Sequence, residues 1–337
     1  MGRRKNIFAI CDGEEKYAVN FVEYANRRSN LPFEYQVFTS MESLGAFSKE
    51  NRIELLLISE TMATEAIGQM NIGQTVLLTE EGVHTGNVQW PAVYKYQSSD
   101  KVIREALSYY SASVPMESTQ VSVKKKIIGI YSPVGRTAKT SFALTMGQLL
   151  AKDHPAIYLN MEEYAGFEQL LECNYEKNIG DLIYYIRQDE MNLSLKLSTM
   201  VHNMNNLDYI PPAMSPLDIQ NTNIGEWMKL LDVIAEDSVY ETVIMDIGDG
   251  VRDLYTLLNR CNLVYMPVRN DVMSQAKIRQ FEELMKAWDY GGLLKRLRKI
   301  QLPYYRTQKK GKDYFDDLVW SQLGDYVRNL MRKDGML

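Results

Sequence analysis

The stretch 126–152 constrains the fold of this chain more than any other. It reads KIIGIYSPVGRTAKTSFALTMGQLLAK. Residues 127–131 form a short apolar run rich in β-branched side chains, which predicts a fully buried strand. A loop follows, and apolar residues then recur at helical spacing from Phe142 to Leu150. A buried strand that passes through a tight loop into a helix predicts an α/β domain with a mostly parallel sheet.

The loop between this strand and helix ends in the sequence Lys-Thr-Ser. In a P-loop, backbone N–H groups and the helix dipole favour a phosphate at this place. Lys139 would then reach the β- and γ-phosphates, Thr140 would hold Mg²⁺, and Ser141 would lie near the α-phosphate. However, Pro133 and Ala138 occupy the two positions where a P-loop has glycine. The loop alone therefore leaves an ordinary strand-to-helix turn as the alternative.

A second candidate for the same site is Asp246, at the end of the apolar run 242–247. A lone carboxylate buried there would be costly. At the carboxyl end of a strand, however, it can accept a hydrogen bond from a Mg²⁺-bound water or from Thr140. The turn 248–250, Gly-Asp-Gly, suits a segment that senses a γ-phosphate. The alternative is an acid that is simply solvated at a strand end.

Length and composition predict a globular protein of two domains. The chain has 337 residues, of which 45% are hydrophobic and 24% charged, so wholesale disorder is excluded. The net charge of -5 gives no general attraction to nucleic acid or anionic lipid. The three cysteines are scattered, which is typical of a reducing compartment, and the three histidines share no ligand spacing. No stretch approaches the roughly 18 apolar residues of a membrane span, so we expect a cytoplasmic protein.

The sequence predicts a boundary near residue 110. Within 1–110, five apolar runs alternate with helical patterns; the runs are 6–11, 33–38, 53–59, 75–79 and 92–96. This alternation predicts a doubly wound parallel sheet of flavodoxin-like order. The Ser-rich segment 111–125 predicts a linker. Residues 126–337 predict a second, larger α/β domain.

The first domain resembles a response-regulator receiver domain. The resemblance places Asp12 in the acidic pocket after the first strand, Thr79 at the switch threonine and Lys95 near the lysine of the fifth strand. Ser59 stands where a receiver has its phospho-acceptor aspartate. Because serine cannot form the acyl phosphate, we expect a degenerate receiver used for docking or dimerisation. The alternative is that these residues are simply the polar ends of a sheet.

Five segments carry a more specific resemblance. In chain order they are SPVGRTAKTS, LNME, LDYIPPAMSPLD, TVIMDIGDG and CNLVYMPVRND. Together they resemble the MinD/ParA class of deviant-Walker P-loop ATPases, and within it they are most similar to the TadZ/CpaE branch of pilus-assembly proteins. That branch also carries a receiver-like N-terminal domain, so the resemblance covers nearly the whole chain. It implies ATP and Mg²⁺ as cofactors and a homodimer.

The resemblance assigns roles to particular residues. The catalytic set is Lys139, Asp246 and Glu162, and the Mg²⁺ contacts are Thr140 and Asp246, the latter through water. The cofactor-binding set is Gly135, Arg136, Thr137, Ala138, Lys139, Thr140, Ser141, Asn160, Asp246, Arg269 and Asn270. The last two are candidates for adenine or ribose contacts, with an ordinary polar strand end as the alternative.

Departures from the class pattern predict weak hydrolysis. Val134 stands where the class has a lysine that reaches the partner's nucleotide, and this removes a cation that would stabilise the transition state. Arg136 either grips phosphate in its place or fills a solvent-facing turn. The class pattern Asp-x-Asp becomes Asn160-Met161-Glu162, in which Glu162 keeps a carboxylate and Asn160 has no basic group. We therefore expect ATP binding with slow or absent turnover, in a dimer that nucleotide stabilises.

Three functions remain open from the sequence. The first is an assembly or localisation factor of a Tad/Flp-type pilus, which would recruit pilus or secretion machinery at the cell pole. The second is a ParA-like partition ATPase that binds DNA through the basic segment 295–312, unless that segment is only a solvated face. The third is a signalling ATPase gated by the receiver-like domain. We expect the final helix, 314–331, to pack on its own sheet and not on a membrane.

Overall fold

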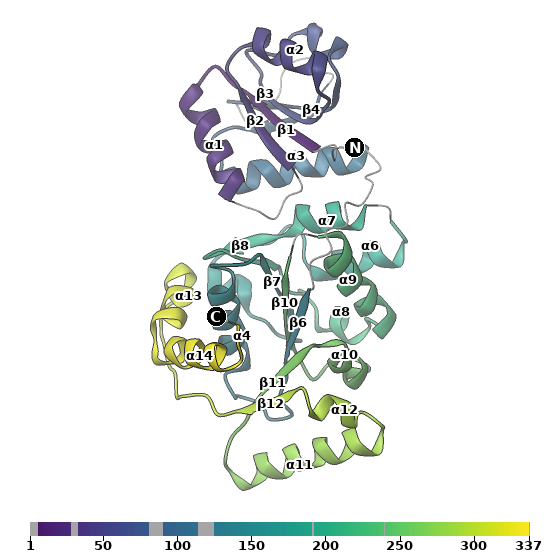
Figure 1. Cartoon of the computed structure of the whole chain (residues 1–337), viewed down its shortest axis with the longest axis vertical. Coiled ribbons are helices and arrows are strands. Elements are labelled where there is room, and N and C mark those ends of the chain that lie inside the picture. The colour runs from purple at the N-terminus through teal and green to yellow at the C-terminus, as the bar shows by residue number, and fades with distance from the viewer. Residues whose placement is uncertain are drawn as a thin grey trace. The chain divides into compact units, whose positions relative to one another are not determined.

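The structure is a computed structural model, and it describes residues 6–27, 33–80, 90–113, 125–190, 192–238 and 240–336. The chain divides into two compact units, Met1–Ser118 with Ser194–Thr199, and Thr119–Leu193 with Met200–Leu337. One sheet has five strands and the other has seven (Figure 1). Most of the predicted linker lies outside the described residues.

The five-stranded sheet is parallel and covered on both faces. Its strands are β1 (Asn6–Cys11), β2 (Phe33–Phe38), β3 (Ile53–Ser59), β4 (Ile72–Thr79) and β5 (Ala92–Tyr94). They lie in the order β2-β1-β3-β4-β5, which confirms the flavodoxin-like order. Helices α1 (Glu15–Arg27) and α3 (Ser99–Ser113) pack on one face. Helix α2 (Met41–Glu50) and the 3₁₀ turn η1 (Glu65–Gln69) pack on the other.

The seven-stranded sheet is mostly parallel, as the sequence predicts. Its strands are β6 (Lys126–Ile130), β7 (Ala156–Met161), β8 (His202–Met204), β9 (Leu207–Ile210), β10 (Thr242–Ile247), β11 (Leu263–Pro267) and β12 (Leu297–Ile300). The order is β12-β11-β6-β10-β7-β9-β8, in which β8 runs antiparallel to β9 and the other pairs are parallel. The central strands β6, β7 and β10 are almost wholly buried, which explains their continuous apolar runs.

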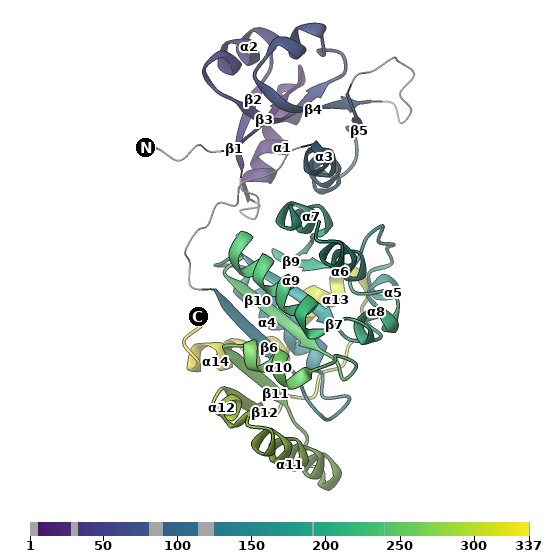
Figure 2. The ribbon, with the colours of Figure 1, turned by 90° about the vertical axis from the view of Figure 1, so that its right-hand side faces the viewer.

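Helices cover both faces of this sheet. The helices from residue 139 onward are α4 (Lys139–Leu150), α5 (Phe167–Leu171), α6 (Ile179–Arg187), α7 (Leu193–Met200), α8 (Pro216–Gln220), α9 (Ile224–Asp237), α10 (Leu254–Arg260), α11 (Val272–Ala287), α12 (Gly291–Leu294), α13 (Gly311–Trp320) and α14 (Gln322–Lys333). Helix α4 lies with α13 and α14 on one face, and α9 and α10 lie on the other (Figures 1 and 2). Helix α4 is buried from Phe142 to Leu150, so the helix that follows the loop is anchored in the core.

The C-terminal helix differs from the prediction. Residues 314–331 were expected to form one helix, but the structure has two, α13 and α14, which meet at Ser321. Ser321 has an extended backbone, and its hydroxyl accepts a hydrogen bond from the N–H of Leu323. Buried residues of α14, among them Val327, pack in the same core as α4. The apolar face of this amphipathic helix is therefore used within the domain.

No helix among the described residues is long and apolar enough to span a bilayer.

Gly324 should be essential for the corner between α13 and α14. A Cβ at this position would lie 2.0 Å from the carbonyl oxygen of Val319, which is backbone and has little room to move. We expect Gly324→Ala to lower the free energy of unfolding by about 2–4 kcal/mol, as measured by urea denaturation. The control is Gly292→Ala in α12, where a Cβ meets nothing within 4 Å. Equal stability of the two variants would contradict this account.

Candidate functional site

Three loops meet at the carboxyl edge of the seven-stranded sheet. In the strand register, Asp246 of β10 pairs with Ile130 of β6 and with Asn160 of β7. Because these strands are parallel neighbours, the loops that follow them emerge at the same edge. The structure thus brings together the loop 131–138, the segment 160–162 and the turn 248–250.

The first of these loops is held by its own hydroxyl groups. Ser132 Oγ donates to the carbonyl oxygen of Pro267 at 2.7 Å and accepts from the N–H of Val134 at 3.2 Å. Thr137 Oγ1 donates to the carbonyl oxygen of Val134 at 3.4 Å. Val134 is buried, so its side chain faces into the protein. The loop is therefore ordered by contacts within the chain and is tied to the end of β11.

Two residues of the loop adopt left-handed backbone conformations. Arg136 has φ 57° and Ala138 has φ 61°. For a residue with a Cβ, this conformation costs roughly 1–2 kcal/mol. Left-handed residues beside a helix start turn successive N–H groups toward one point, which forms a concavity for an anion. At Ala138, where the P-loop pattern has glycine, a strained residue thus adopts the conformation that glycine would adopt.

Lys139 opens α4 and is held by the other two loops. Its ammonium group lies 2.6 Å from Glu162 Oε1 and also donates to the carbonyl oxygen of Ile247. It lies 5.8 Å from the ring centroid of Tyr131. The lysine expected to bind phosphate is therefore paired with the carboxylate expected to orient water. The sequence placed both residues at this edge without indicating the pair.

Asp246 is fully buried beside this pair. Its Oδ2 accepts a hydrogen bond of 3.0 Å from the hydroxyl of Tyr158, while Oδ1 has no hydrogen-bond partner among the described residues. The pKa of Asp246 is raised to about 6 as the net effect of its surroundings; burial raises it most, and Glu162 adds to the rise. Lys139 and the hydroxyls of Thr140 and Tyr158 lower that pKa. The carboxylate is thus costly to ionise and keeps one oxygen free.

The oxygen atoms at this edge suit a magnesium ion that takes most of its ligands from water and nucleotide. Mg²⁺ prefers six oxygens and usually keeps several waters, with one or two carboxylates and substrate phosphates completing the shell. Among the described residues, no three His, Cys, Asp or Glu side chains are placed to hold a metal by themselves. The orphaned Oδ1 of Asp246 and the hydroxyl of Thr140 are oxygens of the required kind. If Mg²⁺ bound here, these two residues would supply two contacts, and nucleotide and water would supply the others.

The other predicted residues lie around this centre. Ser141 Oγ lies 3.1 Å from the hydroxyl of Tyr314. Asn160 is buried and uses both ends of its amide within the chain. Arg269 lies 3.7 Å from Asp271, and Asn270 donates to Gln301 Oε1 at 2.9 Å. Their roles as nucleotide contacts stay predictions.

Tyr158 is a residue of the site that the sequence prediction missed. It lies within the otherwise apolar strand β7, and its hydroxyl joins Asp246 to Asn160. The available signal was its spacing, because residues two apart in a strand face the same side. Tyr158 and Asn160 therefore had to share a face, and a hydroxyl on a buried face needs a partner.

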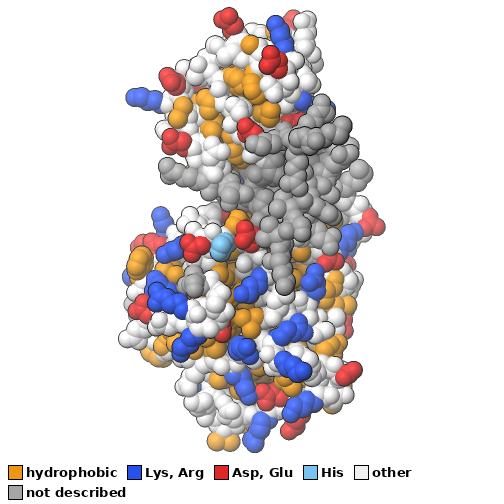
Figure 3. Space-filling view, in the orientation of Figure 1, with side chains coloured by type: hydrophobic (Ala, Val, Ile, Leu, Met, Phe, Trp, Pro, Cys, Tyr) orange, Lys and Arg blue, Asp and Glu red, His pale blue; other side chains and the backbone are white. Residues whose placement is uncertain are grey.

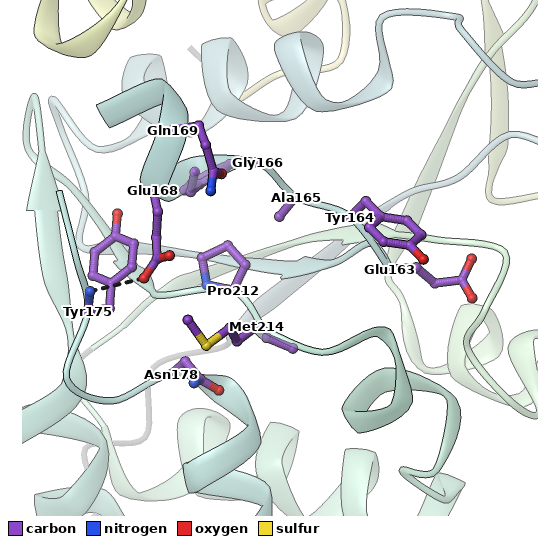
Figure 4. Close-up of a pocket in the computed structure, with 12 residues that line it drawn as sticks. Glu163, Tyr164, Ala165, Gly166, Glu168, Gln169, Tyr175, Asn178, Pro212 and Met214 are labelled. Atoms are coloured by element: carbon purple, nitrogen blue, oxygen red, sulfur yellow. Dashed lines mark hydrogen bonds between the residues drawn. The ribbon is translucent and has the colours of Figure 1, made fainter. Parts of the chain in front are cut away.

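A separate cavity of about 350 Å³ lies beside this centre. Figure 4 shows its lining, which comes from the segment after β7 and from residues 212–214. Glu163 and Glu168 are among the described residues of its lining, and none of these is a lysine or an arginine. Glu168 accepts from the N–H of Tyr175 at 3.2 Å. Because its charged lining is acidic, this cavity does not suit phosphate.

The basic segment 295–312 is partly neutralised within the chain. Lys299 lies 2.7 Å from Glu282, Lys309 lies 2.6 Å from Asp317, and Lys310 lies 3.7 Å from Glu172. Arg296 donates to the backbone and side chain of Asn259. Lysine and arginine side chains are numerous on one face of this unit (Figure 3). Arg298 donates to the carbonyl oxygen of Lys295 at 3.4 Å, so five of the eight basic residues of the segment have partners within the chain.

The acidic pocket of the first unit contains an ammonium group. Lys95 Nζ lies 2.8 Å from Asp12 Oδ2, and both side chains are buried. Glu14 and Glu80 lie 3.3 and 3.8 Å from the same nitrogen. Burial opposes the charge of Lys95, but the bonds to Asp12 and Glu14 outweigh it and raise the pKa of Lys95. Asp12 is therefore neutralised by a side chain of the protein itself.

The chain was compared with family models, with curated proteins and with solved structures. No family model matches the sequence, and no curated protein matches it. A plasmid partition protein from Borrelia burgdorferi B31 bound to AMPPNP is similar in structure, with 16% identity and a TM-score of 0.45, over 63% of this chain and 98% of that one. A ParA family ATPase from Chlorobium tepidum TLS has 18% identity and a TM-score of 0.46, over 58% and 81%.

Replacing Asp246 should stabilise the nucleotide-free protein. Because burial raises the pKa from 3.8 to about 6, the folded state binds the proton more tightly than the unfolded chain does. Stability therefore falls as the pH rises through this window, by on the order of 2–3 kcal/mol. We expect Asp246→Asn to unfold at higher urea than wild type at pH 8, with the difference shrinking toward pH 5. Asp153→Asn, at an exposed position, is the control, and a difference independent of pH would contradict the prediction.

Proposed function

We propose that this chain binds ATP with Mg²⁺ at the carboxyl edge of its seven-stranded sheet and hydrolyses it slowly. The observation that carries the proposal is the juxtaposition of Lys139 with the buried Asp246, whose Oδ1 is unpaired. A buried carboxylate with a free oxygen is destabilising unless a ligand uses it. The left-handed loop before α4 supports phosphate binding at the same place.

The same geometry supports slow turnover. Val134 is buried where the class has a lysine that reaches across the dimer, so that cation is absent. Arg136 is exposed, and no interaction holds its guanidinium group within the described part of the chain. Glu162 is paired with Lys139, which competes with any role in orienting water. We propose that ATP acts mainly as a structural ligand that favours a homodimer.

The biological role that we propose follows the sequence resemblance to the TadZ/CpaE branch. The chain would be an assembly or localisation factor of a Tad/Flp-type pilus that recruits components of the pilus or secretion machinery at the cell pole. We propose residues 126–337 as the ATP-binding domain and 1–110 as a degenerate receiver-like docking module. The buried pair of Lys95 and Asp12 supports the second assignment, because the acid is already neutralised.

Binding of ATP is the first test. We expect calorimetry to show one ATP bound per chain in the presence of Mg²⁺, with a shift toward dimer in light scattering. Lys139→Ala removes a charge-assisted contact to phosphate and should weaken the affinity by about 10–100-fold. The control is Lys152→Ala, which removes a lysine that lies over Trp320 after the end of α4. Absence of binding by wild type would overturn the proposal, and rapid turnover abolished by Lys139→Ala would overturn its slow-hydrolysis part.

Glu162 should compete with nucleotide for Lys139. The ion pair of 2.6 Å must open before the ammonium group can contact a phosphate. We therefore expect Glu162→Gln to bind ATP about tenfold more tightly than wild type in calorimetry, because an amide holds the lysine less strongly. The neighbouring variant Glu163→Gln, whose carboxylate is bonded to Gln220, is the control. An unchanged or weaker affinity of Glu162→Gln would contradict this competition.

The cellular role has its own test. Deleting the gene should remove surface pili, and wild type should restore them while Lys139→Ala does not. Normal pili in the deletion strain would overturn the pilus role and leave the ATP site to be judged by calorimetry.

A further inference from the structure

We propose that Tyr158 and Asn160 are a matched positioning pair that sets the direction of the hydrogen bond to Asp246. By occupying Oδ2 of the carboxylate, the pair leaves Oδ1 for the water shell of Mg²⁺. This inference rests on the proposed MgATP site and assigns two residues that act through Asp246.

The pair begins with a side-chain amide of defined orientation. The N–H of Glu162 donates to Asn160 Oδ1 at 3.0 Å. Because a backbone N–H can only donate, the oxygen of the amide must face Glu162. The Nδ2 group therefore faces the hydroxyl of Tyr158, 2.8 Å away. The orientation of the Asn160 side chain follows from the backbone of the next loop.

The amide then determines where the phenol proton points. A tyrosine hydroxyl has one proton and can also accept, whereas an amide nitrogen only donates. With Asn160 donating to its oxygen, Tyr158 must direct its proton to the other neighbour, Asp246 Oδ2, at 3.0 Å. The Tyr158 ring stacks on Phe167 at 6.0 Å with an interplanar angle of 3°, which limits rotation of the phenol. All three polar side chains of this chain of bonds are buried.

An aspartate at position 160 would not serve this arrangement. With its first oxygen still bonded to Glu162 N–H, its second oxygen would face the hydroxyl and accept. Two carboxylates would then compete for the single proton of Tyr158, in a buried region where both charges are costly. Asn160, which stands where the class pattern has aspartate, is thus the residue that Tyr158 requires. The change from aspartate to asparagine therefore removes a carboxylate and also supplies the donor that the Tyr158 hydroxyl needs.

The test separates Mg²⁺-dependent from Mg²⁺-independent binding. Calorimetry would measure the Kd of ATP with Mg²⁺ and with EDTA, and the ratio of the two values is the magnesium increment. We expect Tyr158→Phe and Asn160→Ala each to reduce this increment about tenfold, with the EDTA value changed less than about twofold. Asn160→Asp should reduce it at least as much as Asn160→Ala. The control is Tyr209→Phe, which removes a hydroxyl 2.9 Å from that of Tyr175.

The decisive result is the double variant. If Asn160 acts through Tyr158, adding Asn160→Ala to the Tyr158→Phe variant should lower the magnesium increment by less than about twofold. The pair would be overturned if Asn160→Ala lowered the magnesium increment equally in wild type and in Tyr158→Phe. It would also be overturned if the variants lost ATP affinity equally with and without Mg²⁺.

A measurement without nucleotide keeps the two proposals distinguishable. The proton NMR signal of the buried Tyr158 hydroxyl, assigned by its loss in Tyr158→Phe, should move upfield in Asn160→Ala, because a donor to the hydroxyl strengthens the bond that the hydroxyl donates. Tyr209→Phe should leave it in place. If wild type bound no ATP, the proposed function would be wrong, but this NMR signal would still test the interaction between Tyr158 and Asn160. An unmoved signal in Asn160→Ala would overturn the pair whether or not ATP binds.

Discussion

The burial of the Asp246 carboxylate is the main constraint on the carboxyl edge of the seven-stranded sheet. The strand β10 is central in the sheet, and the side chain of its acid, Asp246, is fully buried. The surroundings compensate in part, through the nearby ammonium of Lys139 and the hydroxyl of Tyr158. The compensation is incomplete, since one oxygen stays unpaired. Proteins commonly retain such a cost where a ligand completes the site.

Lys139 brings a second charged group to the same edge of the sheet. Its ammonium group is paired with the carboxylate of Glu162 and with the carbonyl oxygen of Ile247, and these contacts occupy the group that we propose for phosphate binding. A similar ion pair occurs in the first unit, where Lys95 neutralises Asp12. The two cases differ in exposure: Lys95 and Asp12 are buried, whereas Glu162 is partly open to solvent and so able to yield to a competing anion.

The sequence predicted the sheet better than it predicted the contacts. Buried strands such as 242–247 have continuous apolar runs that leave few alternatives, and the parallel order then placed Asp246 beside the loop. The break at Ser321 was missed because the apolar spacing of a helix continues through it. The pair of Lys139 with Glu162 was missed because a pattern specifies which loops meet, not which side chains join. The conformation of Ala138 was also out of reach, since local propensity opposes it.

The hydrogen bond from Ser132 to the carbonyl oxygen of Pro267 has a mechanical consequence. It ties the start of the loop 131–138 to the end of β11, after which Arg269 and Asn270 follow. Two segments that are far apart in the sequence are therefore linked at their bases, so that one cannot shift along the sheet without straining the other. A ligand that touched both would meet a preformed frame and would lose little free energy in ordering it. For the ATP binding that we propose, such rigidity would lengthen the lifetime of the complex.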